Sequence, residues 1–63
     1  MTHIIIKCST GMLQANSDAC NLIYDFMTEK GAEHQDAANV AGWADLAEVG
    51  EEYELEGFEI FVV

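Results

Sequence analysis

Residues 52–63 read EYELEGFEIFVV, and their polar pattern changes at one glycine. Up to Gly57, glutamates alternate with apolar residues, and this period of two indicates a strand with one polar and one apolar face. Beyond Gly57 the alternation resumes in the opposite phase, as a bulge or a tight turn would produce. The segment is therefore predicted to form either one bent strand or a short hairpin.

A further strand is predicted at residues 3–8, near the other end of the chain. Ile4, Ile6 and Cys8 share one face of this strand, and the residues between them share the other. The sequence Ser-Thr-Gly at residues 9–11 is expected to end the strand, because small residues of this kind favour turns.

Between these segments, apolar residues recur with the spacing of an α-helix. One face of this helix would carry Ala19, Leu22, Ile23, Phe26 and Met27. Residues 16–18, Asn-Ser-Asp, precede the face as N-cap candidates, and Gly31 follows as a stop. The segment is predicted to be an amphipathic helix.

A second helix is predicted from about residue 36 to residue 49, with Gly50 as its stop. Its larger apolar residues fall on one side, as in a helix that packs against a core. That side holds Val40, Trp43, Leu46 and Ala47. The opposite side holds Ala37, Ala41, Ala44, Asp45 and Glu48.

The order strand, helix, helix, strand indicates an α+β fold in which two helices pack on a small antiparallel sheet. Residues 1–63 are predicted to form a single domain. A chain of 63 residues buries only about 60% of the surface that its unfolded form exposes, so its stability is expected to be marginal. The hydrophobic share of 51% is nevertheless enough to supply a core.

The composition is strongly acidic, with twelve acidic and two basic residues and a formal net charge of −10. Such a surface repels nucleic acids and anionic membranes and attracts basic protein surfaces. The longest apolar run, residues 60–63, is far shorter than the roughly 20 residues of a membrane span. The first residues do not resemble a secretory signal, and two cysteines fit a reducing compartment, so a cytoplasmic location is expected.

The acidic residues are concentrated in the second half of the chain. Residues 31–63 contain nine acidic and no basic residues, whereas residues 1–30 contain three acidic and two basic ones. We expect the densest part of this second half to bind a basic partner. The predicted partner-binding residues are Asp45, Glu48, Glu51, Glu52, Glu54, Glu56 and Glu59.

Two local features make these charges unfavourable for the isolated fold. Asp45 and Glu48 fall near the predicted end of the second helix, where the helix dipole favours basic residues by about 0.3–1 kcal/mol each. Glu52, Glu54 and Glu56 share one strand face at a spacing of roughly 7 Å, which gives about 0.6 kcal/mol of repulsion per pair in water. Acidic residues also keep small proteins soluble and protect strand edges, but that role does not account for the missing basic residues.

Residues 43–59, WADLAEVGEEYELEGFE, resemble small phage-encoded DNA-mimic proteins, which include anti-restriction and anti-CRISPR proteins. The resemblance lies in composition and in the layout of charge. It implies a non-catalytic inhibitor that occupies the basic DNA-binding groove of a nuclease or a CRISPR surveillance complex, with carboxylates in place of phosphates. Trp43, Tyr53 and Phe58 would supply apolar anchors beside these charges, and for Trp43 and Phe58 the alternative is a place in the core.

A different class of function is an antitoxin or adaptor that binds one basic partner protein, or that assembles as a small homo-oligomer. Residues 58–63 motivate this alternative. A strand with two apolar faces needs cover on each side.

Enzymatic chemistry is not expected. Residues 7–12, KCSTGM, resemble the phosphocysteine loop of sugar-phosphotransferase IIB domains, which would make Cys8 a phosphate acceptor. The next residues depart from that loop, since Leu13–Ala15 replace its glycine and hydroxyl residues and no arginine is present to hold phosphate. The histidines and cysteines lack the spacing of a metal site, so neither a metal nor another cofactor is predicted.

Overall fold

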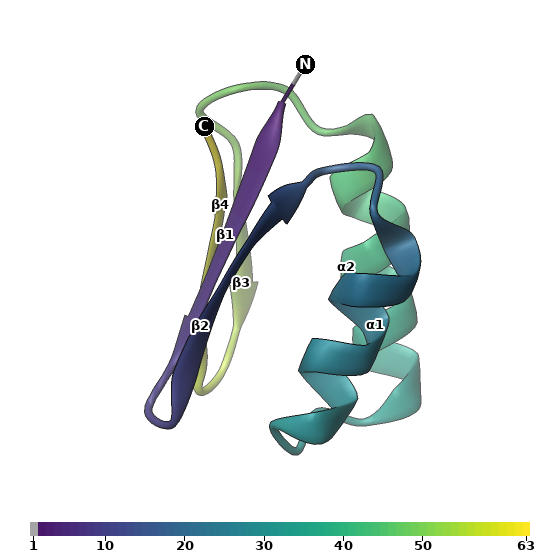
Figure 1. The fold of residues 1–63 in the computed structure, drawn as a ribbon, viewed down its shortest axis with the longest axis vertical. Helices are drawn as coiled ribbons and strands as arrows, with labels where there is room; N and C mark the ends of the chain where they lie inside the picture. Colours follow the sequence, from purple (N-terminus) through teal and green to yellow (C-terminus); the bar gives the residue numbers. More distant parts are fainter. Residues whose placement is uncertain (1) are drawn as a thin grey trace.

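The computed structural model describes residues 2–63, which form four strands and two helices. In chain order they are β1 (His3–Cys8), β2 (Gly11–Asn16), α1 (Cys20–Glu29), α2 (His34–Leu46), β3 (Glu52–Leu55) and β4 (Phe58–Val62). The strands form one antiparallel sheet in the order β2-β1-β4-β3. Both helices cover the same face of this sheet (Figure 1). The predicted α+β class, with two helices on a small antiparallel sheet, is confirmed.

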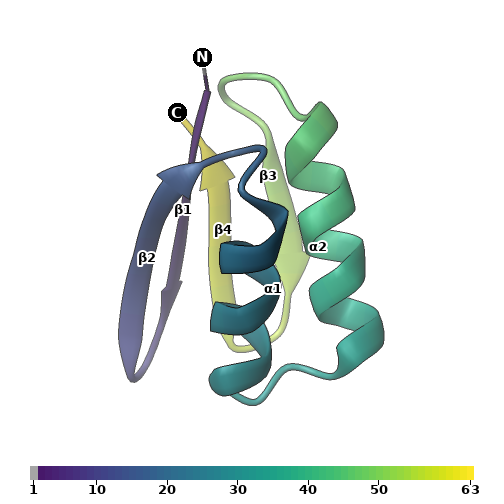
Figure 2. The ribbon, with the colours of Figure 1, turned by 45° about the vertical axis from the view of Figure 1, so that its right-hand side comes forward.

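The core lies between the helices and the sheet. The buried apolar side chains are Ile4, Ile6, Ile60 and Val62 from the sheet, Ile23 and Met27 from α1, and Ala37, Val40, Ala41 and Ala44 from α2. The period of two places alternate residues of each strand on this side, which confirms the predicted face of residues 3–8. The opposite side of the sheet, here called the outer face, is not covered by a helix (Figure 2).

The buried face of α2 differs from the prediction. Val40 is buried as expected, but its companions are the three alanines of the predicted opposite side, whereas Leu46 is 84% exposed. Trp43 is half-buried at the margin of the core, where its ring centroid lies 5.3 Å from that of Tyr53 on β3. Small side chains allow α2 to lie close to α1, so the small residues rather than the large ones face inward.

The second helix also ends earlier than predicted. Leu46 is its last residue and Ala47 is its C-cap, so Glu48 lies beyond the helix and Gly50 does not end it. The expected cost of Glu48 at the helix end is therefore wrong, while Asp45 does stand in the last turn, which contains no basic residue. No helix within residues 2–63 is both long enough and apolar enough to cross a bilayer.

Residues 11–16 form an additional strand, β2, that the residue pattern did not indicate. The turn Ser9-Thr10 joins it to β1, and Cys8 pairs with Gly11 across that turn. The predicted N-cap of the first helix is wrong, because α1 starts at Cys20 and its N-cap, Ala19, makes no side-chain capping bond. Ser17 is instead buried and shares a hydrogen bond with the hydroxyl of Thr2.

Residues 52–63 adopt the hairpin, one of the two predicted possibilities. Leu55 pairs with Phe58, and Glu56 and Gly57 form the turn between β3 and β4. Gly57 has φ 87°, a conformation that glycine adopts without steric cost. Glu56 therefore lies in the turn and is not part of the strand row that contains Glu52 and Glu54.

Candidate partner-binding surface

The seven predicted partner-binding residues are all exposed, and they follow the β3 side of the molecule from one end to the other. We call this set the acidic strip. It comprises Asp45 at the end of α2, Glu48 and Glu51 in the connection to β3, Glu52 and Glu54 on β3, Glu56 in the hairpin turn and Glu59 on β4. The connection 47–51 and the hairpin turn lie at opposite ends of the long axis (Figure 1), so the strip spans that axis.

The strongest concentration of like charge lies across the hairpin. Glu54 on β3 stands directly opposite Glu59 on β4. The side chains of directly opposed residues have Cβ atoms about 4.5–5.5 Å apart, and like charges at such positions destabilise a sheet. Lys7 on β1 stands opposite Glu59 on its other side. One lysine therefore adjoins a pair of glutamates, and the pair keeps a net negative charge.

One member of the acidic strip has a structural role. The carboxylate of Glu51 accepts a hydrogen bond of 2.5 Å from the backbone N–H of Glu48, and the backbone N–H of Glu51 donates to the carbonyl of Glu48 at 3.1 Å. These two bonds close the turn that leads from α2 into β3. Glu51 therefore helps to shape the connection that carries it, whereas no hydrogen bond ties down the carboxylates of Glu52, Glu54 and Glu59 among the described residues.

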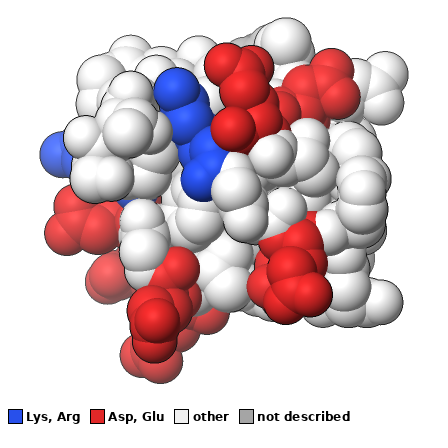
Figure 3. Space-filling view, turned by 90° about the horizontal axis from the view of Figure 1, so that it is seen from below, with Lys and Arg blue, Asp and Glu red and all other residues white. Residues whose placement is uncertain are grey.

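Two further carboxylates join the strip at the end of the molecule where the hairpin turn lies. Glu33 and Asp36, at the start of α2, line a hollow together with Glu56 and the half-buried Phe58. Figure 3 views this end and shows acidic side chains on several sides of it, with lysine between some of them. The sequence separates Glu33 and Asp36 from Glu56 by some twenty residues, and only the packing of α2 beside the hairpin brings them together.

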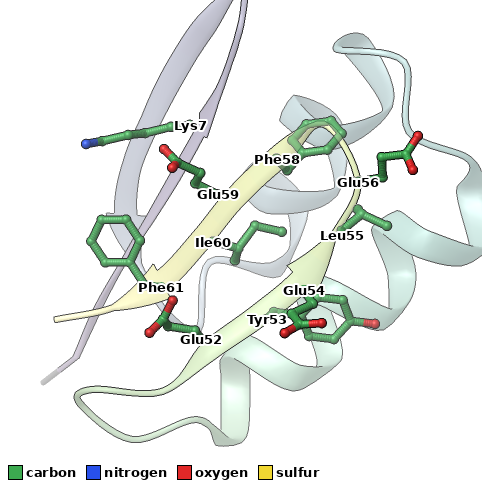
Figure 4. Close-up of a pocket in the computed structure, with 10 residues that line it drawn as sticks. All are labelled: Lys7, Glu52, Tyr53, Glu54, Leu55, Glu56, Phe58, Glu59, Ile60 and Phe61. Atoms are coloured by element: carbon green, nitrogen blue, oxygen red, sulfur yellow. The ribbon is translucent and has the colours of Figure 1, made fainter.

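The outer face of the sheet adds an apolar centre beside the strip. Ile5 on β1 and Phe61 on β4 are directly opposed, and both are half-buried. The Nζ atom of Lys7 lies 5.7 Å from the centroid of the Phe61 ring. Figure 4 shows Lys7, Glu59, Phe61 and Glu52 along one side of the hairpin.

Phe61 is the aromatic residue that this surface presents, and it was not among the predicted binding residues. Trp43, Tyr53 and Phe58 are instead half-buried and packed against the core. For Trp43 and Phe58 this placement agrees with the core alternative, whereas Tyr53 was expected only as an anchor of the interface. The signal for Phe61 was present in its alternation with Ile60, which put it on the face opposite the core.

The end of β1 leads into a tight turn and not into a long loop. Cys8 is followed by a two-residue turn and then by β2, and both cysteines are free thiols. The Thr10 hydroxyl, 3.6 Å from the sulfur, lowers the pKa of the Cys8 thiol, with smaller contributions from the backbone of Thr10 and Gly11 and from Lys30, against an opposing effect of burial. Within residues 2–63, no three His, Cys, Asp or Glu side chains form a cluster that could hold a metal.

Comparison with known proteins gives no relative. No family model matches the chain, and neither a curated protein nor a solved structure matches it.

Proposed function

We propose that this protein is a non-catalytic inhibitor that occupies the basic DNA-binding groove of a nuclease or a CRISPR surveillance complex. The observation that carries the proposal is the exposed acidic strip, in which Glu54 and Glu59 are directly opposed. Repulsion within the strip is unfavourable in the free protein and would be relieved in a groove lined by Lys and Arg. Binding would then compete with DNA for the same attraction and counterion release.

The spacing of the strip supports substitution of carboxylates for phosphates. Its seven carboxylates are distributed along the long axis of the molecule, which measures 27 Å, with Glu54 and Glu59 side by side, so the mean density is about one charge for every 4 Å. One strand of DNA carries a phosphate about every 3.4 Å along the helix axis. The mean charge densities along the two axes are therefore similar.

A competition experiment tests the proposal. Purified bacterial nucleases and CRISPR surveillance complexes, each loaded with fluorescent duplex DNA, would be titrated with the protein at about 50 mM salt. We expect displacement of DNA from at least one of them, and we expect Glu54→Lys/Glu59→Lys to lose at least tenfold in competing strength. Displacement should also weaken steeply as salt rises, because charge pairing across a groove is screened.

The matched control reverses the charge of two acidic residues that lie outside the acidic strip. Asp25→Lys/Glu29→Lys on α1 changes the net charge by the same amount, and both positions are exposed. This variant should compete nearly as well as the parent. Equal losses in both variants would mean that overall charge, and not the strip, governs binding, and an absence of displacement throughout would refute the proposal.

The apolar pair on the outer face favours a second candidate function, an adaptor or antitoxin that binds one basic protein. Ile5 and Phe61 would form the centre of such an interface, and Glu52 and Glu59 would form its charged rim. Phe61→Ser distinguishes the two functions. Binding that disappears in this variant but changes little with salt would support the adaptor.

A further inference from the structure

The two edge strands of the sheet differ in how strongly their side chains discourage pairing with a strand of another chain. β3 carries Glu52 and Glu54, and charged side chains on an edge discourage pairing with another chain. β2 forms the other edge and contains neither a charged residue nor a proline in the sequence GMLQAN. Its Met12 side chain is 52% exposed. In a protein of net charge −10, this neutral edge stands out as the place where another strand can approach.

The register of β2 shows which of its backbone groups are free. Cys8 and Gly11 close a two-residue turn, so this pair exchanges hydrogen bonds, and every second pair along the ladder does the same. The N–H and C=O groups of Leu13 and Ala15 therefore point toward β1. Those of Met12 and Gln14 point away from the sheet, and no strand within residues 2–63 pairs with them.

The helix above β2 extends this neutral surface. Leu22 of α1 is 58% exposed, and Phe26, one turn further along the same side, is half-buried. Lys30 continues this side, and its Nζ atom donates a hydrogen bond to the carbonyl of Thr10 at 3.4 Å. Leu22 and Phe26 thus form an apolar surface beside the unpaired edge of β2, and the positive charge of Lys30 lies at its end.

We propose that β2 pairs antiparallel with β2 of a second copy of this chain, around a two-fold axis perpendicular to the sheet and with Leu13 opposite Leu13. In this register Met12 lies opposite Gln14 of the second copy, so the free N–H and C=O groups of both residues are satisfied in both chains. Directly opposed residues point to the same face of a sheet, so the two Leu13 side chains meet beneath the helices. The product is a continuous sheet of eight strands.

The layout of charge explains why a second copy binds at the β2 edge and not at the β3 edge. The two-fold axis places the acidic strips at the two distant ends of the joined sheet, separated by seven strand spacings of about 4.8 Å, or roughly 34 Å. It also brings Lys30 at the end of α1 toward the partner subunit's Asp18, which precedes the start of the other α1. The β3 edge, by contrast, would bring two acidic strips together.

Sedimentation velocity of the purified chain tests the proposal. At about 0.5 M NaCl, where repulsion between the copies is screened, we expect twice the monomer mass of 6.9 kDa. Gln14→Pro removes an N–H that points away from the sheet, so the monomer should keep its fold by circular dichroism while the dimer is lost. Asn39→Lys, on an exposed position of α2, should leave the dimer intact.

Cross-linking provides a second and independent measurement of the register. In a background of Cys8→Ser and Cys20→Ser, Leu13→Cys should form a disulfide between chains, because opposed residues without mutual hydrogen bonds have Cα atoms about 4.5 Å apart. Asn39→Cys should not. The proposal is overturned if the parent remains monomeric at millimolar concentration, if folded Gln14→Pro remains dimeric, or if Leu13→Cys cross-links no faster than Asn39→Cys. A dimer that is lost only in Phe61→Ser would pack through the outer face instead, which also overturns it.

Discussion

Glu54 and Glu59 carry the same charge at directly opposed positions of neighbouring strands. An opposite-charge pair at such a position would contribute to sheet stability, whereas this pair opposes it. Both side chains are exposed, so water and salt moderate the repulsion. The pair therefore weakens the hairpin slightly and leaves two carboxylates available to a basic partner.

Replacing one member of this pair should stabilise the protein and weaken partner binding at the same time. We expect Glu54→Lys to raise the free energy of unfolding by about 0.5 kcal/mol, since a cross-strand repulsion becomes an attraction. Urea denaturation at low salt measures the change, and most of it should disappear at about 1 M NaCl. Glu54→Gln, which removes the charge without reversing it, should give a smaller gain. A loss of stability in Glu54→Lys would show that the two carboxylates do not repel each other in the folded state.

The sequence could predict only part of this site at the scale of residues. The period of two placed Glu52 and Glu54 on one strand face, and that placement is correct. The opposition of Glu54 and Glu59 depends on the hairpin turn at Gly57, and a bent strand was equally compatible with the pattern. The contribution of Glu33 to the acidic end depends on how α2 packs, which local spacing does not determine.

At the scale of elements, side-chain size alone predicts the wrong buried face for α2. The rule that large apolar residues point inward assumes that a helix has room for them. α2 packs closely against α1 and carries alanine at three of its four buried positions, while Leu46 faces solvent at the end of the helix. Close packing of this kind selects small side chains, and a sequence read without its neighbours does not reveal the distance between helices.

Enlarging a buried alanine of α2 should therefore cost more than shortening its exposed leucine. We expect Ala44→Leu to lower the free energy of unfolding by about 1–3 kcal/mol, because Ala44 has no exposed surface and the core has little space for three more carbons. Leu46→Ala should change it by less than about 0.5 kcal/mol. Thermal or urea denaturation of the two variants provides the comparison. If Leu46→Ala were the more damaging change, the orientation of α2 described here would be incorrect.

The strand β2 was overlooked for a related reason. Its sequence GMLQAN contains no β-branched or aromatic residue, and its first residue is a glycine that also fits a loop. What holds it in place is pairing with the strongly apolar β1, from which only a two-residue turn separates it. The fold class could be predicted because the helices and the strongly patterned strands suffice for it, but the full strand order depends on pairing between segments.

At the scale of the whole molecule, a net charge of −10 is carried by a chain whose radius of gyration is only 10.0 Å. The Debye length is about 30 Å at 0.01 M salt and about 10 Å at 0.1 M, so at low salt every charge of this molecule interacts with every other. Self-repulsion of this kind opposes the compact state more than the expanded unfolded chain. The folded protein should consequently be least stable at low ionic strength.

Salt should therefore act in opposite directions on folding and on partner binding. Between about 0.01 M and 0.5 M NaCl we expect the Tm, measured at low micromolar concentration in Gln14→Pro to avoid association, to rise by several degrees, since each kcal/mol shifts the Tm of a domain this small by roughly 4–8 °C. Asp25→Lys/Glu29→Lys, with less net charge, should respond less. Displacement of DNA from a basic groove should weaken over the same range of salt. Salt screens the attraction between the acidic strip and the groove just as it screens the repulsion among the carboxylates. A Tm that stays constant would mean that the carboxylates do not destabilise the fold, so a basic partner would have no repulsion in the free protein to relieve.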